Sequence, residues 1–294
     1  MFIEPDLGRS EHDLADTGTP GDAAAGIRHL RPVVDREGAL NGLAADVGAP
    51  STAQDELRST GRLTLLGGFR LLAGNELLPV SLTGQRLVAL AACRKGPVSR
   101  TQVAHLLWPD TTSERAHANL RTAVYRLEHS CPGLVETTNS HLWLAPGLQV
   151  DVTHVDHLAK RILATSGPLD SELIEAALHA NLTDDLLPDW CDEWLEEYQS
   201  RHRQLRLTTL ETLAHRLSIT GHHGAAVNTA LAAVHADAFR DSAHQTLVRA
   251  CLAQGNRHEA FTHFSAYRRV FRDELGVEPT ETFGELVQSV RTAV

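Results

Sequence analysis

Residues 113–130 read Ser-Glu-Arg-Ala-His-Ala-Asn-Leu-Arg-Thr-Ala-Val-Tyr-Arg-Leu-Glu-His-Ser. At a helical spacing of about 100° per residue, an apolar stripe falls on one side of this stretch. Its members are Ala116, Leu120, Ala123, Val124 and Leu127. The opposite side carries arginine, amide and hydroxyl groups, which suit phosphate oxygens and base edges. The stretch therefore predicts an amphipathic DNA-recognition helix capped by Ser113.

Nine residues are candidates for contact with DNA. Those on the predicted recognition helix are Arg115, Asn119, Arg121, Thr122, Tyr125 and Arg126. Arg100 and Thr101 open the preceding helix, where free backbone N–H groups suit a phosphate. Thr138 lies in the hairpin predicted to follow. The alternative to DNA contact is that the arginines only form a solvated charged helix face and that Asn119 is an exposed amide.

The neighbouring segments complete a winged helix with an N-terminal sheet. Before the recognition helix, short apolar runs in residues 63–82 predict a small antiparallel sheet. Thr83 is expected to cap a first helix, and Ser99 a second, with Gln102 completing a capping box. After it, residues 134–144 have the pattern of a hairpin turning at Asn139-Ser140.

Length and charge divide the chain into parts of different character. Its 294 residues have room for two domains, and a hydrophobic content of 42% is typical of a globular protein. The net charge is −10, yet residues 61–150 hold 9 Lys and Arg against 5 Asp and Glu. Residues 1–60 lack sustained periodicity and are expected to form a mostly disordered leader. No apolar run has the length of a signal core or membrane span, so a cytoplasmic protein without membrane contact is expected.

Residues 151–294 are predicted to be almost wholly helical and contain an internal repeat. Residues 221–226 and 255–260 match at an offset of 34, with a glycine opening each segment. Thirty-four residues is the tetratricopeptide period, in which each unit is a helix pair packed on its neighbour. The expected fold class is thus mainly α with a small β component, a winged helix-turn-helix followed by an all-α tetratricopeptide-like domain.

Enzyme and cofactor chemistry finds little support in the sequence. The only lysines are Lys95 and Lys160, and neither belongs to a phosphate-binding Gly-Lys-Ser/Thr loop. The cysteines are too far apart for a CxxC pair and are expected to be free thiols. His154 and His157 stand three residues apart, without a further ligand at a recognised metal spacing. No catalytic constellation can be identified, so we expect neither an enzyme nor a bound cofactor or metal.

Several segments together resemble the Streptomyces antibiotic regulatory protein (SARP) family. They are Leu65–Phe69, Leu107–Asp110, Ala118–Arg121 with Arg126–Leu127, Trp194–Leu195 with Arg201–Leu205, Gly255–Arg257 and, most specifically, Tyr267–Arg268 with Phe271–Pro279. The family combines an OmpR-like winged helix, here residues 61–150, with a bacterial transcriptional activator domain, here residues 151–294. Without an ATPase domain, the chain resembles the small form.

The resemblance implies a pathway-specific activator of a secondary-metabolite (antibiotic) gene cluster. Such proteins bind direct repeats of double-stranded DNA near a promoter and recruit RNA polymerase, so a second protomer on DNA is expected. In OmpR-like activators the loop before the recognition helix contacts polymerase. The corresponding residues are Pro109, Asp110, Thr111 and Thr112.

Two departures from the family leave a second interpretation open. The hairpin lacks the usual Gly-Tyr, and Glu128 stands where a basic residue is common. A helical-repeat adaptor whose winged helix binds protein instead of DNA is the alternative. The operator, the regulated pathway, the role of residues 1–60, the oligomeric state off DNA and any regulatory signal are not encoded in recognisable motifs.

Overall fold

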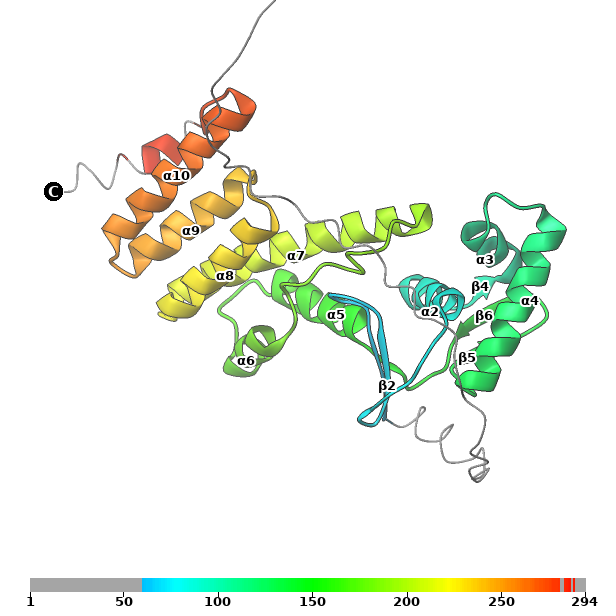
Figure 1. Ribbon diagram of the computed structural model, residues 1–294. Helices are drawn as coiled ribbons and strands as arrows, with labels where there is room; N and C mark the ends of the chain where they lie inside the picture. Colours follow the sequence, from blue (N-terminus) through cyan, green and yellow to red (C-terminus); the bar gives the residue numbers. More distant parts are fainter. Residues whose placement is uncertain (1–59, 281–282, 287, 289–294) are drawn as a thin grey trace, which may run out of the picture. The chain divides into compact units, whose positions relative to one another are not determined.

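The computed structural model describes residues 60–280, 283–286 and 288 (Figure 1). The predicted leader therefore lies outside the described residues, except for Thr60. The described residues all fall within one compact unit, residues 48–294. No helix in this part of the chain is long and apolar enough to cross a membrane.

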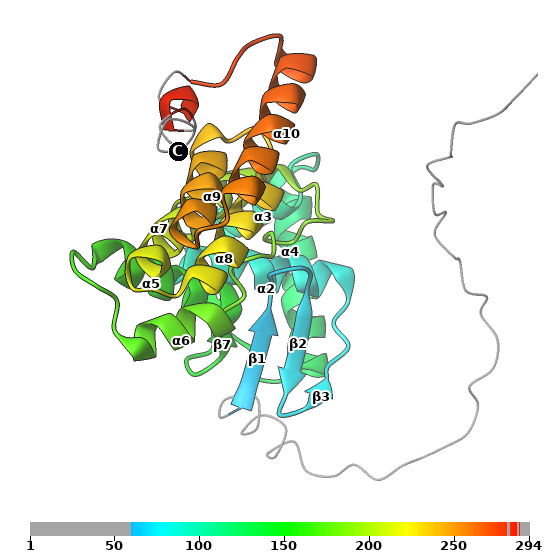
Figure 2. The same ribbon diagram turned by 90° about the vertical axis from the view of Figure 1, so that its left-hand side faces the viewer.

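A four-stranded sheet begins the described chain, and its strands are visible in Figure 2. They are β1 (Gly61–Thr64), β2 (Arg70–Ala73), β3 (Glu76–Leu77) and β7 (Gln149–Val150), in the order β3-β2-β1-β7. The predicted antiparallel strands form, with Leu63 opposite Leu71. The sheet ends earlier than expected, at Leu77, and Leu82 already belongs to a helix. β7 was not foreseen; it pairs in parallel with β1.

Three helices and a second sheet follow. The helices are α2 (Leu82–Arg94), α3 (Arg100–Leu107) and α4 (Ser113–Ser130). The second sheet contains β4 (Val98–Ser99), β5 (Val135–Thr137) and β6 (His141–Leu144), in the order β4-β6-β5. β5 and β6 form the predicted hairpin, which is the wing, and β4 adds a third strand to it.

The predicted N-caps differ from the observed ones in detail. Ser81, not Thr83, caps α2 by accepting from the backbone N–H of Gly84 at 3.3 Å. Thr112, not Ser113, caps α4, because its extended backbone (ψ 150°) directly precedes the first helical residue. Ser99 is the N-cap residue of α3, but its side chain makes no capping hydrogen bond.

Six longer helices follow in the described chain, and residues 283–286 form a further helical turn. They are α5 (Asp151–Ala164), α6 (Ser171–His179), α7 (Glu193–Ile219), α8 (His223–Ala236), α9 (Asp241–Ala253) and α10 (Arg257–Leu275). α8 packs against α7 and α9, and α10 packs against α9. The predicted fold class is confirmed as mainly α with a small β component, in which a winged helix precedes a helical domain.

The two copies of the internal repeat adopt the same turn. Gly221 and Gly255 have φ angles of 83° and 84°, in the left-handed region that glycine enters at little cost. In each turn the following residue donates its backbone N–H to a carbonyl five residues earlier. These bonds run from His222 to Leu217 and from Asn256 to Cys251, both at 2.9 Å. The 34-residue offset thus corresponds to equivalent helix–turn–helix units, while the tetratricopeptide assignment remains a prediction.

The segment between α6 and α7 joins the N-terminal sheet to the helical half. Leu66 forms an antiparallel bridge with Leu186, and the N–H of Leu187 donates to the carbonyl of Leu65 at 2.9 Å. Gly67 allows the close approach, since a Cβ there would lie 2.7 Å from the Asp184 carboxylate. Arg206 of α7 is only 1% exposed, and its side chain binds this segment. Its guanidinium donates to the Thr183 carbonyl and pairs with Asp185, both at 2.7 Å.

Candidate nucleic-acid interface

The helix α4, which the sequence predicts to be a recognition helix, is anchored by its apolar stripe. Ala116, Leu120 and Leu127 are each at most 4% exposed, and Ala123 is also buried. α3 and α2 pack against α4, so burial of these side chains fixes the rotation of the helix. Val124 is only half-buried. The predicted apolar face is therefore the packed face.

The opposite face of α4 is open and positively charged. Arg115, Arg121 and Arg126 are exposed, and Tyr125 is 74% exposed. Within the described part of the chain, none of the three arginine side chains forms a hydrogen bond or an ion pair. Because a guanidinium offers five N–H donors, this face presents unused donors of the kind that phosphates and guanine edges accept.

Thr122 and Asn119 are less available than the arginines. The hydroxyl of Thr122 donates to the carbonyl of Ala118 at 3.1 Å, so only its acceptor lone pairs and its methyl group face outward. Asn119 is half-buried on the shoulder of the helix.

Glu128 lies at the C-terminal end of α4, where its carboxylate is engaged by the turn that follows the helix. Its carboxylate accepts from the backbone N–H of Gly133 at 3.2 and 3.3 Å. This hydrogen bond uses the acidic group to hold the turn that leads into β5. The departure from the family pattern at this position therefore has a structural role.

A polar groove of about 640 Å³ lies beside α4. It is lined by the beginning of α3, by one side of α4 and by the turn of the wing. Four of the nine predicted contact residues meet there, namely Arg100, Thr101, Arg121 and Thr138. The other five, Arg115, Asn119, Thr122, Tyr125 and Arg126, do not line the groove.

The groove also contains residues that sequence reasoning missed. His117, one helical turn before Arg121, lines it together with Thr137, Asn139 and Ser140 of the wing. The signal in the sequence for His117 was its spacing of four residues from Arg121, which places both side chains on the same face of a helix. The wing residues could be assigned only once the hairpin was placed against α3.

The start of α3 is less free than expected. The backbone N–H of Arg100 donates to the carbonyl of Ser140 in the wing at 2.9 Å, so it is not available to a phosphate. The expectation of a free N–H at this residue was wrong because β4 brings the wing onto the helix start. The half-buried side chain of Arg100 still lines the groove without an ionic partner among the described residues.

Thr138 shapes the wing turn. Its hydroxyl oxygen accepts from the N–H of His141 at 3.0 Å, and its own N–H donates to the His141 carbonyl at 2.8 Å. These bonds close the hairpin without the glycine of the usual wing. Thr138 therefore contributes to the groove mainly by holding the turn in place.

The loop before α4 is exposed at Pro109, Asp110 and Thr112. Thr111 is half-buried and bonds to the carbonyl of Trp108 at 3.1 Å, while Thr112 serves as the N-cap. Part of this loop also lines a cleft of about 840 Å³ whose other wall is residues 189–194. The predicted polymerase loop is thus bordered by a segment of the helical half.

Other chemistry has little basis in the described residues. No group of three His, Cys, Asp or Glu side chains there could hold a metal ion. Burial raises the pKa of the Cys93 thiol to about 12 and that of Cys251 to about 11, so both remain protonated at neutral pH. Cys191 is the exposed thiol among the four free cysteines.

Comparison with known proteins assigns the helical half. Residues 167–291 match the bacterial transcriptional activator domain. The regulatory protein AfsR of Streptomyces coelicolor is 26% identical over 251 residues, which cover 82% of this chain and 25% of AfsR. AfsR of Streptomyces griseus is 25% identical over 79% of this chain and 24% of its own length. The chain therefore carries a match to the bacterial transcriptional activator domain and is similar to SARP-type transcriptional regulators.

The solved structures contain the same fold. The chain resembles Mycobacterium tuberculosis EmbR, solved in complex with a low-affinity phosphopeptide, with a TM-score of 0.62 and 16% identity. The match covers 79% of this chain and 65% of the EmbR chain. At this identity the similarity shows the fold alone. The chain spans about a quarter of the length of the AfsR proteins that it matches.

Proposed function

We propose that this regulator is a sequence-specific DNA-binding activator. Residues 61–150 act as the winged-helix DNA-binding domain, and residues 151–294 act as the transcriptional activator domain. The observation that carries the proposal is the open face of α4, where Arg115, Arg121 and Arg126 have no partner among the described residues. Opposite charges four residues apart stabilise an exposed helix face, whereas these arginines have no such pair among the described residues, and Arg121 lines the polar groove.

The roles of individual groups follow from their position. Arg121 and Arg126 reach phosphates or guanine edges, and Arg115 and Arg100 extend the positive surface along the DNA backbone. Asn119 is suited to adenine, and Thr122 and Tyr125 to phosphate or a thymine methyl group. Thr101 and Thr138 line the groove at the helix start and the wing.

The SARP resemblance extends the proposal to the promoter. The regulator binds direct repeats near the promoter of an antibiotic gene cluster, in the cytoplasm, and recruits RNA polymerase there. Direct repeats require two protomers arranged head to tail instead of by a two-fold axis. The loop at residues 109–112 is the proposed polymerase contact, supported by its exposure at three of four positions.

Salt dependence of DNA affinity tests this proposal. Fluorescence anisotropy would be measured with the full chain and labelled promoter fragments from the neighbourhood of its own gene, between 50 and 200 mM NaCl. Each phosphate neutralised contributes about −0.9 to the slope of log affinity against log salt. Four arginines on phosphates would give about −3.6 per protomer. A shuffled fragment of equal composition is the control for specificity.

The second candidate is the helical-repeat adaptor with a winged helix that binds protein. It is favoured by the wing, whose turn is closed by Thr138 and lacks a basic residue. If the full chain shows no salt-dependent binding to any of the promoter fragments, the DNA proposal is overturned and this adaptor is supported.

A further inference from the structure

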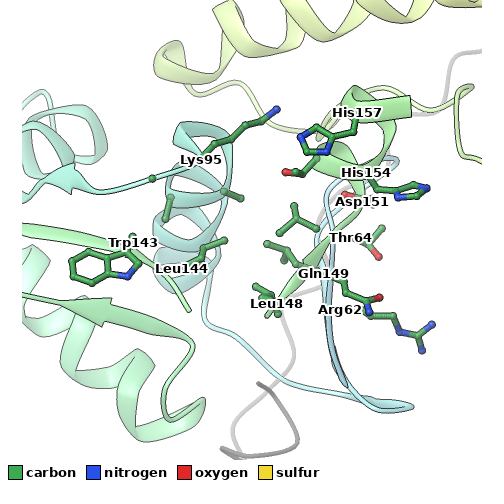
Figure 3. A pocket seen from close by; sticks show the side chains of 16 residues that line it. Arg62, Thr64, Lys95, Trp143, Leu144, Leu148, Gln149, Asp151, His154 and His157 are labelled. Atoms are coloured by element: carbon green, nitrogen blue, oxygen red, sulfur yellow. The ribbon is translucent and has the colours of Figure 1, made fainter. Parts of the chain in front are cut away.

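A second cavity, of about 780 Å³, lies away from the proposed DNA-contact residues (Figure 3). Its walls come from β1, the end of α2, the segment from β6 to β7, and α5. Cavities of roughly 300–1,000 Å³ with mostly apolar walls are typical of small-molecule sites. The apolar part of the wall consists of Leu63, Ala91, Ala92, Trp143, Leu144, Leu148 and Val150.

Hydrogen-bond donors gather at one end of this cavity. Lys95 extends toward His157 in Figure 3, and Leu144 and Leu148 lie on the apolar side. Among the described residues, His157 has no hydrogen-bond partner. The ammonium of Lys95 bonds to Asp156, which uses one of its three N–H donors and leaves two.

Asp151 is the one carboxylate among the lining residues, and its oxygens are already engaged. Both oxygens accept from the backbone N–H of Leu65 at 3.0 Å. Oδ1 also accepts from Val152 at 2.6 Å, and Oδ2 accepts from Leu66 at 3.0 Å. With Asp151 occupied and one Lys95 donor paired with Asp156, the two remaining Lys95 donors and His157 have no hydrogen-bond partner among the described residues.

We propose that this cavity binds a small molecule with an apolar body and one carboxylate. The carboxylate accepts hydrogen bonds from Lys95 and His157, and the apolar body packs on Leu144 and Leu148. Such a ligand would touch both the winged helix and α5 and would hold them together. The proposal does not depend on DNA binding.

The test uses 8-anilinonaphthalene-1-sulfonate as a fluorescent probe with the full chain. Octanoate, octylamine and octanol then compete with the bound probe. We expect octanoate to displace it at concentrations at least about tenfold lower than octylamine or octanol, because only octanoate carries the negative charge that the Lys95 ammonium attracts. Equal or better displacement by octylamine would overturn the proposal.

Two pairs of variants locate the binding. Thr153→Trp fills the cavity and is expected to abolish probe binding, whereas Thr208→Trp on the exposed face of α7 should leave it unchanged. His157→Ala should raise the half-displacement concentration of octanoate about tenfold, while that of octanol stays the same. His215→Ala, at another exposed position, is its control. Unchanged probe binding in a natively folded Thr153→Trp variant, judged by circular dichroism, would place the probe elsewhere and overturn the proposal.

Discussion

The ammonium of Lys95 at the end of α2 pairs with the carboxylate of Asp156 on α5. The same carboxylate lies 3.8 Å from Nδ1 of His202, a buried residue of α7. Burial disfavours the charged form of Asp156, but the imidazole of His202 and the ammonium of Lys95 outweigh it and lower its pKa. The winged helix is therefore tied to the helical half by a carboxylate that must be ionised.

Asp156→Asn is expected to lower the free energy of unfolding at pH 7 by about 1 kcal/mol, a modest value because Lys95 is 39% exposed. A carboxyl group whose pKa is lowered by folding stabilises the protein above its unfolded pKa of about 3.9. That contribution is lost as the pH falls through the folded pKa. Urea unfolding should thus show the variant and the wild type converging below about pH 4. Asp273→Asn, at an exposed position, is the control; a difference that persists undiminished at pH 3 would contradict this account.

Arg121→Ala and Arg126→Ala are each expected to weaken DNA binding by about 1–3 kcal/mol if base contacts are lost. Loss of a phosphate contact would instead reduce the salt slope by about one and weaken binding to all sequences alike. Arg269→Ala removes an arginine that is equally exposed, on α10, and should leave affinity unchanged. Gel shifts with the promoter fragment and its shuffled form distinguish these cases. Unaltered affinity in both α4 variants would remove this helix from the interface.

Because His244 is buried, we expect the protein to lose stability in mild acid. Burial lowers its pKa below 6.5, although its bond to the Ala238 carbonyl acts in the opposite direction. Because the unfolded chain then binds more protons, the free energy of unfolding should decrease as the pH falls below about 6.5. His244→Phe retains an aromatic ring on Tyr267, whose ring centroid lies 3.9 Å away, and should flatten this part of the stability curve. His235→Phe, an exposed substitution on α8, should leave the slope in place.

Replacing glycine by alanine is expected to have opposite effects on stability in the two repeated turns and within a helix. Gly221→Ala and Gly255→Ala should each lower the free energy of unfolding by about 1 kcal/mol, because alanine is strained at positive φ. Neither site has an atom within 4 Å of the added Cβ, so the cost is conformational. Gly224→Ala, within α8 and equally open, should instead stabilise by about 0.5–1 kcal/mol. Thermal unfolding of the three variants measures both signs, and equal shifts in all three would refute the turn argument.

Features encoded locally were predictable from the sequence. The apolar stripe of α4 identified its packed side, because five apolar side chains at helical spacing can lie together on only one side of the helix. The match at an offset of 34 residues set Gly221 and Gly255 at equivalent positions, and both lie in a turn between two helices. The cap of α4 was misplaced by one residue because Thr112 and Ser113 are both good N-caps, and only the backbone angles separate them.

Features formed between distant segments were not predictable. β7 has two residues and depends on β1, far earlier in the chain, for its hydrogen bonds. Arg206 stands in a charged run that suggests a solvated helix face, yet it is buried because the segment before α7 folds over it. The use of the Arg100 N–H by Ser140 likewise follows from tertiary pairing of β4 with the wing. Contacts of this kind leave no periodic signal in sequence.

The bridge between Leu66 and Leu186 limits how this chain can be recombined with its relatives. A chimaera joined at residue 150 would inherit Gly67 from one parent and the segment that closes over it from the other. Any mismatch would leave backbone donors of the first sheet and the Arg206 guanidinium without acceptors, away from solvent. Exchanging residues 61–150 therefore requires moving residues 182–207 with them, so that the N-terminal half and this part of the helical half are inherited as one physical unit.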